Sequence, residues 1–204
     1  MSPAVALALA VALAAPPAGT APGEAERPML AAPAGSPFSL EGRAGGSTCG
    51  YCGITLGGAV DKRWGWMLAG GFVEVAAPVN PTAPTTTKPS RTVGSYFFGG
   101  HAGAVGELRG GHRVGVALEA GAQLASVRTD YALGSPLLGR KQTAVLPILG
   151  ARASVAWRLS SGNLVGIGAF FREPLTQPCL DVGLGCHPPS ATYGVVVLGS
   201  LDLR

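Results

Sequence analysis

Charged residues are scarce in this chain, and the lack of charge clusters excludes some classes of protein. Asp, Glu, Lys and Arg make up 13% of the 204 residues, and the formal net charge is only +4. The basic residues are scattered, with no basic patch interleaved with aromatics, so we expect no nucleic-acid partner. A convincing amphipathic helix is also missing, whereas glycine is abundant at 32 residues. Many short segments punctuated by Gly and Pro predict an all-β sandwich or barrel.

Long hydrophobic runs are absent beyond the N-terminus, so we expect no bilayer-spanning helix there. Residues 4–15 form one apolar run of signal-peptide length, and small residues at positions 19–21 offer a cleavage site. No Lys or Arg precedes the run, so an Ala-rich leader is the alternative, and the lack of a nearby cysteine argues against a lipoprotein anchor. We predict a signal peptide over residues 1–21, a flexible lead-in over residues 22–36 and one domain over residues 37–204.

Apolar and polar residues alternate with period two through residues 94–127, which is typical of two antiparallel strands with different environments on their faces. A three-residue turn at the centre sets Glu107 opposite Arg113, and His101 opposite Glu119, all on the polar face. A two-residue turn would set apolar positions opposite polar ones and mix the faces. We assign the apolar face to the outside, because a membrane barrel turns that face to lipid.

The same alternation predicts eight strands, at about residues 37–47, 53–60, 64–77, 94–108, 112–127, 143–158, 163–172 and 191–203. Short turns are expected at residues 61–63, 109–111 and 160–162, and long loops at residues 79–93, 128–142 and 173–190. Residues 48–52 form a shorter loop where a long one is expected. Short turns at one rim and longer loops at the other are typical of outer-membrane barrels.

The aromatic residues fall next to the connections, in two groups that we assign to the outer face. Those beside short turns are Trp64, Trp66 and Trp157, and those beside long loops are Phe72, Tyr96, Phe98, Phe171 and Tyr193. Leu68 is assigned outward with Phe72. Two such bands fit the aromatic girdles at the membrane interfaces. Alternatively the rings fill the core of a soluble β-sandwich, but the polar face would then have to face solvent.

Polar side chains of the inward face form the predicted lumen network: Glu41, Arg43, His101, Glu107, Arg113, Glu119, Arg152, Arg158, Arg172 and Asp202. They are not expected to face lipid, since Arg or Lys at the bilayer midplane costs about 2–4 kcal/mol each. An eight-stranded barrel has room inside for side chains but not for a wide channel. Paired acids and bases would therefore plug the lumen, which argues against a general diffusion pore.

On these strands, turns and girdles, residues 37–204 resemble the small eight-stranded outer-membrane barrels of the OmpA/OmpX type. The resemblance implies an all-β, eight-stranded, antiparallel up-and-down transmembrane β-barrel. It further implies a place in the outer membrane of a Gram-negative-type bacterium, with both termini in the periplasm and the long loops outside the cell.

Four cysteines fall in two outer connections, Cys49 and Cys52 in the first and Cys179 and Cys186 in the last. Closure of the barrel brings the two connections together. Zinc is conceivable with His187, but the second pair is not a close knuckle. In an oxidising compartment we favour disulfides within each connection, while bridges between the two remain open.

The sequence offers no catalytic constellation and predicts no cofactor and no metal. No Ser, His and Asp set has the spacing of a nucleophile motif, and His101 is interpreted as a structural hydrogen-bond partner. We expect a monomer surrounded by outer-membrane lipids, with a structural role or a binding role toward an extracellular ligand or protein through the long loops. A lipid-modifying barrel enzyme and a soluble lipocalin-like carrier are the alternatives, although a carrier would need an apolar lumen.

Overall fold

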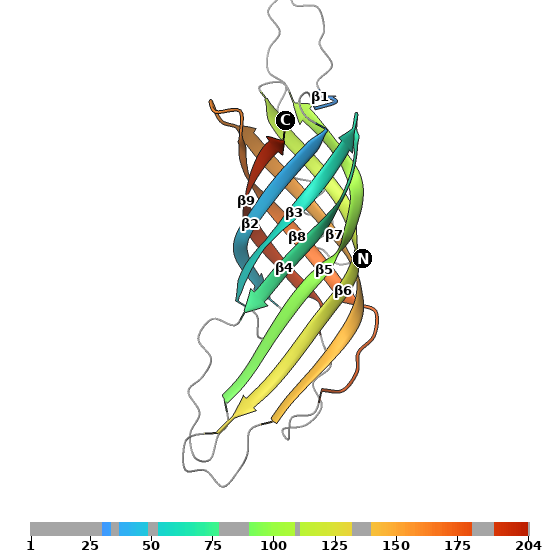
Figure 1. Cartoon of the computed structure of the whole chain (residues 1–204), viewed down its shortest axis with the longest axis vertical. Helices are drawn as coiled ribbons and strands as arrows, with labels where there is room; N and C mark the ends of the chain where they lie inside the picture. Colours follow the sequence, from blue (N-terminus) through green and yellow to red (C-terminus); the bar gives the residue numbers. More distant parts are fainter. Residues whose placement is uncertain are drawn as a thin grey trace, which may run out of the picture.

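The computed structural model describes residues 30–33, 37–48, 53–77, 90–108, 111–131, 140–180 and 190–203 (Figure 1). Its strands are β1 (Leu30–Ala31), β2 (Phe38–Thr48), β3 (Ile54–Trp64), β4 (Met67–Ala77), β5 (Ser90–Leu108), β6 (His112–Asp130), β7 (Arg140–Arg158), β8 (Leu164–Pro174) and β9 (Thr192–Leu203). No helix in these ranges has the length and apolar character needed to cross a membrane.

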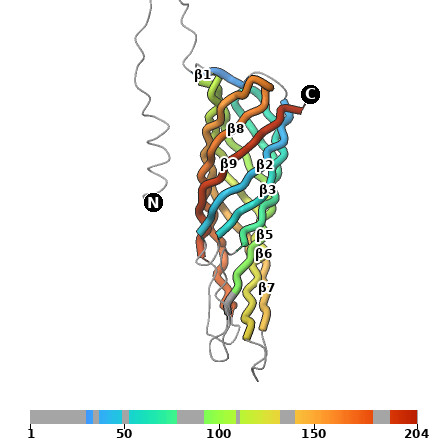
Figure 2. Tube along the Cα trace, turned by 90° about the vertical axis from the view of Figure 1, so that its left-hand side faces the viewer, coloured from blue at the N-terminus to red at the C-terminus, as the bar shows by residue number. Residues whose placement is uncertain are grey.

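Strands β2 to β9 form a closed antiparallel barrel in which each strand pairs with its neighbours in sequence. Strands β2 and β9, the first and last of the barrel, close it, since Phe38 pairs with Leu203 and Thr48 with Tyr193. The strands are tilted and twisted around the barrel axis (Figure 2). All eight predicted strands are present, and the predicted fold class is confirmed.

The hairpin of β5 and β6 has the predicted register, with Glu107 opposite Arg113 and His101 opposite Glu119. Its turn ends at Gly111, which has φ 80° and whose amide donates to the Leu108 carbonyl at 3.1 Å. The turn between β7 and β8 repeats this geometry at Gly162, with φ 88°. Both positions need the left-handed conformation that glycine adopts without steric cost.

The first short turn lies elsewhere than predicted. Residues 61–63 belong to β3, and the chain reverses at Gly65 (φ 60°) and Trp66, where Trp64 pairs with Met67. The observed turn has two residues and lies about three positions later than the predicted one. As a result, the side chains of β4 face the opposite way from the prediction. Leu68 and Phe72, predicted to face outward, therefore point into the barrel with only 8% and 3% of their surfaces exposed.

Strands β5, β6 and β7 have 19 residues each, while the other barrel strands have 11 or 12. Their extra length projects beyond the barrel at the lower end of Figure 1, as a three-stranded extension that we call the outer sheet. The long loops predicted at residues 79–93 and 128–142 are correspondingly shorter. The sequence-based boundaries stopped where outward positions become polar, although the backbone pairing continues.

A small apolar cluster covers the inner face of the outer sheet. Ala125, Val127 and Leu146 are buried against Leu180, with Val93 and Ala144 packed around them. Leu180 belongs to the connection after β8. The start of this connection lies beside β7, where the Leu175 amide donates to the Pro147 carbonyl at 2.8 Å. Residues 175–180 of this connection thereby lie beside the inner face of the outer sheet.

One short strand falls within the region predicted as a flexible lead-in. Strand β1 pairs with the end of β5, with Leu30 opposite Leu108 and Ala31 opposite Glu107. This pairing attaches that part of the lead-in to the rim that carries the short turns. The predicted signal peptide lies outside the described residues.

Candidate functional site: outer belt and charged lumen

The outer surface of the barrel carries an apolar belt, defined by the outward side chains between Val114 and Leu124 on β6 and their neighbours around the barrel. Leu118 is 73% exposed and Val145 65% exposed, whereas Glu119 is only 1% exposed. Val114 and Leu124 are ten residues apart on β6. At about 3.3 Å per residue and a tilt of about 40°, this separation spans roughly 25 Å of height. That height matches the apolar band of outer-membrane barrels.

Aromatic side chains border the belt at both rims. Trp64, Trp66 and Trp157 are exposed near the short turns, and Tyr96, Phe98 and Tyr193 are exposed near the long connections. Phe171 also faces outward but is only partly exposed, while Phe72 is buried in the lumen, contrary to its predicted place in the girdle. At the short-turn rim the Lys62 ammonium lies 5.0 Å from the Trp64 ring centroid and 5.2 Å from that of Phe38. A cation stacked on aromatic rings is favourable at the membrane–water interface, where the Lys62 side chain can reach lipid headgroups.

Arg172 is the centre of the polar network inside the barrel. Its Nη1 donates to Glu74 Oε2 at 2.6 Å and its Nε donates to Glu119 Oε2 at 2.7 Å. The guanidinium carbon lies 4.7 Å from the centroids of Phe72 and Phe170. Both ion pairs are at most 1% exposed, so aromatic faces and carboxylates replace the water that this cation loses.

Arg43 connects Glu74, a partner of Arg172, to a further carboxylate, that of Glu41. Its Nη1 donates to Glu74 Oε1 at 2.5 Å and its Nε donates to Glu41 Oε1 at 2.6 Å. Arg152 donates to the same Glu41 oxygen from the opposite wall, at 2.7 Å. Strands β2, β4, β6, β7 and β8 are thus cross-linked through the lumen.

A second cluster lies near the short-turn rim. Arg63 donates to Asp202 at 2.8 Å, and Arg113 and Arg158 donate to Glu107 at 3.2 and 2.7 Å. Over both clusters the described lumen contains six arginines and six carboxylates. The arginines, Arg43, Arg63, Arg113, Arg152, Arg158 and Arg172, pair with Glu41, Glu74, Glu107, Glu119 and Asp202, and the sixth carboxylate, Asp61, pairs with His101. The charges of these twelve side chains sum to zero.

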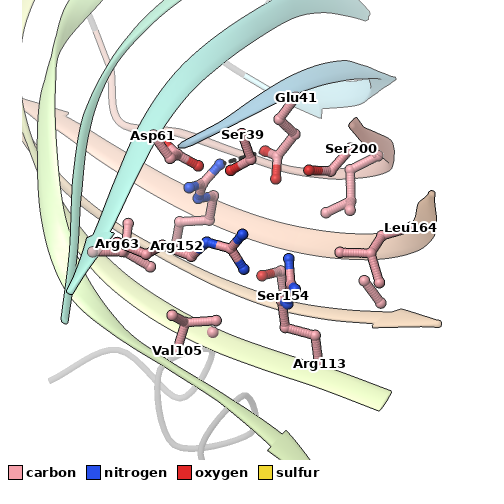
Figure 3. Close-up of a pocket in the computed structure, with 14 residues that line it drawn as sticks. Ser39, Glu41, Asp61, Arg63, Val105, Arg113, Arg152, Ser154, Leu164 and Ser200 are labelled. Carbon is pink, nitrogen blue, oxygen red and sulfur yellow. Dashed lines mark hydrogen bonds and ion pairs between the residues drawn. The ribbon is translucent and has the colours of Figure 1, made fainter. Parts of the chain in front are cut away.

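A cavity of about 50 Å³ lies between the two clusters (Figure 3). Its lining includes Arg63, Arg113 and Arg152 together with the serines Ser154 and Ser200. A buried water needs about 10–15 Å³ of such space, so a few waters fit between the clusters. The lumen therefore has polar space for water at this level.

All ten polar residues predicted for the lumen lie in the network, but the partner of His101 differs from the one expected. Although His101 opposes Glu119 in register, its Nε2 lies 2.6 Å from Asp61 Oδ1. Its Nδ1 is buried without a hydrogen-bond partner among the described residues, so no nucleophile hydroxyl lies on it there. This geometry is that of a structural pair rather than of a general base activating a nucleophile.

Sequence reasoning missed three members of the network, Asp61, Arg63 and Glu74. The first two were assigned to a turn that the chain makes three residues later. For Glu74 the signal was present, because Val73 and Val75 alternate with it and are exposed. Phe72 and Glu74 are two residues apart and share one face of β4. Because Phe72 was predicted to face outward, Glu74 was not assigned to the lumen.

The cysteines are mostly outside the described residues, which include only Cys179. It is not a free thiol. Among the described residues, no group of three His, Cys, Asp or Glu side chains could hold a metal ion. The pairing of the cysteines stays a prediction.

An apolar outer belt around a lumen lined with ion pairs defines the molecule as a membrane β-barrel. No known family and no curated protein matches the sequence. The crystal structure of Neisserial surface protein A (NspA) superposes with a TM-score of 0.55 at 9% identity, over 81% of this chain and 96% of that one. The chain therefore has the fold of a small eight-stranded outer-membrane barrel.

Two further solved structures are similar at lower TM-scores. Ail, the attachment invasion locus protein of Yersinia pestis, gives 0.46 at 11% identity, over 84% of this chain and 95% of that one. The N-terminal β-barrel domain of OprF from Pseudomonas aeruginosa gives 0.42 at 13% identity, over 80% and 97%.

Proposed function

We propose that the protein is a monomeric integral protein of the outer membrane of a Gram-negative-type bacterium, directed to the envelope by its signal peptide. The observation that carries the proposal is the reversed distribution of side chains. Leu118 is 73% exposed while Arg172 and Glu119 are each 1% exposed. Exposing this apolar surface to water is unfavourable in free energy, whereas lipid around the apolar belt removes that cost.

The lumen, in this proposal, is a closed structural plug and not a conduction path. Its cross-wall ion pairs, such as Arg152 with Glu41 and Arg172 with Glu74, occupy the space that a pore would need. Conduction would require desolvated charges to separate, which is costly in a low-dielectric interior. The role is then structural or binding, exerted by the outer sheet and the long connections toward an extracellular ligand or protein.

The two alternatives have less support. A lipid-modifying enzyme needs a nucleophile and a base near the outer rim, whereas His101 is held by Asp61 inside the lumen. A lipocalin-like carrier needs an apolar cavity and a wettable outside, and the side-chain distribution is the opposite.

Reconstitution tests the proposal directly. Protein folded from urea into phosphatidylcholine vesicles should migrate on gels differently before and after boiling, and should stay with the vesicles after an alkaline wash. In planar bilayers it should give no steady current at moderate salt. Failure to associate with vesicles would overturn the membrane assignment, and a steady conductance would overturn the plug.

A further inference from the structure

Two basic side chains oppose each other directly on the outer face of the outer sheet. Arg128 of β6 pairs in register with Lys141 of β7. They share the face of the apolar belt, because Leu124 and Val145 are partners four residues nearer the barrel on the same two strands. Opposed residues have Cβ atoms about 4.5–5.5 Å apart, and like charges in that position are destabilising. An anion between the two side chains would remove this repulsion.

Neutralisation within the described part of the chain is incomplete. Arg128 Nε donates to Asp130 Oδ1 at 2.8 Å, and the Arg128 side chain remains 62% exposed. Among the described residues no ion pair involves Lys141, which is exposed. Within the described ranges Asp130 is thus paired with Arg128 alone, and this contact uses only the Nε of the guanidinium.

The height of the pair relative to the belt matches the lipid headgroups. Leu124 and Val145 form the last apolar rung, Ser126 and Thr143 the next, and Arg128 with Lys141 the one after. Four residues along a tilted strand raise the pair by roughly 10 Å above the last apolar rung. Headgroups extend about 5–8 Å beyond the hydrocarbon on each side, and Arg and Lys side chains bend toward such an interface. The two charges therefore reach the phosphate level, with two hydroxyls directly below.

We propose that Arg128 and Lys141 bind the phosphate of an anionic lipid headgroup in the outer leaflet, with Ser126 and Thr143 as hydroxyl partners beneath. A guanidinium binds phosphate oxygens in a bidentate manner and an ammonium adds a point charge. The acyl chains of the same lipid lie along the rung of Leu124 and Val145. This inference rests on the proposed function and adds the chemistry of a lipid that the protein selects.

Lipid binding by variants tests the site. Native mass spectrometry of detergent-purified protein measures binding of phosphatidylglycerol against phosphatidylcholine for the wild type, Arg128→Gln, Lys141→Gln and the double variant. The wild type should prefer phosphatidylglycerol, and each single substitution should weaken that preference about fivefold. The matched control is Arg140→Gln, which removes the same charge one residue away on the inner face, opposite Thr129. It should change the preference less than twofold.

Three results would overturn the site. The first is a wild type that does not prefer phosphatidylglycerol over phosphatidylcholine, and the second is an Arg140→Gln effect as large as that of Lys141→Gln. The third is that millimolar inorganic phosphate displaces phosphatidylglycerol from the protein. The last result would identify free phosphate as the ligand. Insertion into phosphatidylcholine vesicles is measured in parallel. A wild type that does not insert contradicts the proposed function, whereas one that inserts without lipid selectivity contradicts only this inference.

Discussion

Arg172 shows at the scale of one residue how the barrel stabilises charge away from water. Two carboxylates, those of Glu74 and Glu119, and three aromatic rings surround one guanidinium. The rings are those of Phe72, Phe97 and Phe170. Desolvating the charges is costly, so each member depends on the others. Losing one member leaves partners that are buried and uncompensated.

Arg172→Leu is expected to destabilise the barrel by about 3–5 kcal/mol, because Glu119 loses its closest cation while it stays buried. The measurement is urea unfolding in phospholipid vesicles. Arg140→Gln, at an exposed position, should change stability by less than about 0.5 kcal/mol. Equal stabilities of the two variants would show that the lumen pairs contribute nothing.

Leu118→Arg is expected to impair folding into lipid far more than Ala117→Ser. Leu118 is 73% exposed on the belt and Ala117 is 7% exposed in the lumen. A cation near the midplane of the lipid face costs about 2–4 kcal/mol, whereas a hydroxyl in the polar lumen finds partners. Folding yields from heat-modifiability gels check the assignment of faces, and similar yields would contradict it.

At the scale of elements, the outer sheet depends on a segment that is remote in sequence. Three strands extend past the rim, and their inner face is apolar at Ala125, Val127 and Leu146. Leu180 covers that face from the connection after β8. The extension is thus a folded part of the wall with its own small core, not a pair of independent hairpin tips.

Leu180→Ala should loosen the outer sheet without opening the barrel. Removing a buried leucine should lower the local opening free energy by roughly 2 kcal/mol. Hydrogen exchange should accelerate at the amides near Val127 and Leu146 and stay unchanged in mid-barrel amides such as that of Leu118. Leu175→Ala, which truncates a side chain that is 57% exposed, is the control. Faster exchange throughout the barrel would contradict an independent local core.

At the scale of the whole molecule, the cysteines connect fold and compartment. Cys49 and Cys52 follow β2, while Cys179 and Cys186 follow β8, and the two connections lie on the same rim. Thiols on the outer side of a cell envelope are expected to be oxidised. Bridges within each connection and bridges between them both remain compatible with this arrangement.

Thiol titration of the unreduced, denatured protein from cell envelopes should find no free cysteine. Peptide mapping should then show Cys49 joined to Cys52 and Cys179 to Cys186. Four titratable thiols would contradict the disulfides and weaken the assignment of the compartment. Bridges between the two connections would leave the compartment intact and change only the pairing.

Alternation along the sequence was enough to predict eight strands, a closed barrel and the faces of every barrel strand except β4, because a period of two is a local property of the chain. Alternation placed Leu118 outward and Glu119 inward, and matching the faces was enough to set the register of the β5–β6 hairpin. Glycines at equivalent turn positions, Gly111 and Gly162, marked two of the three short turns.

Which groups meet inside the barrel and how far its wall extends depend on contacts between segments that are far apart in the sequence. Charge partners come from strands remote in sequence, so alternation could place His101 in the lumen but not on Asp61. The turn at Gly65 was missed because a shift of three residues keeps the alternation and only exchanges the faces. The outer sheet was missed because its outward face becomes polar where the lipid ends, while the burial of Val127 and Leu146 depends on Leu180 from another connection.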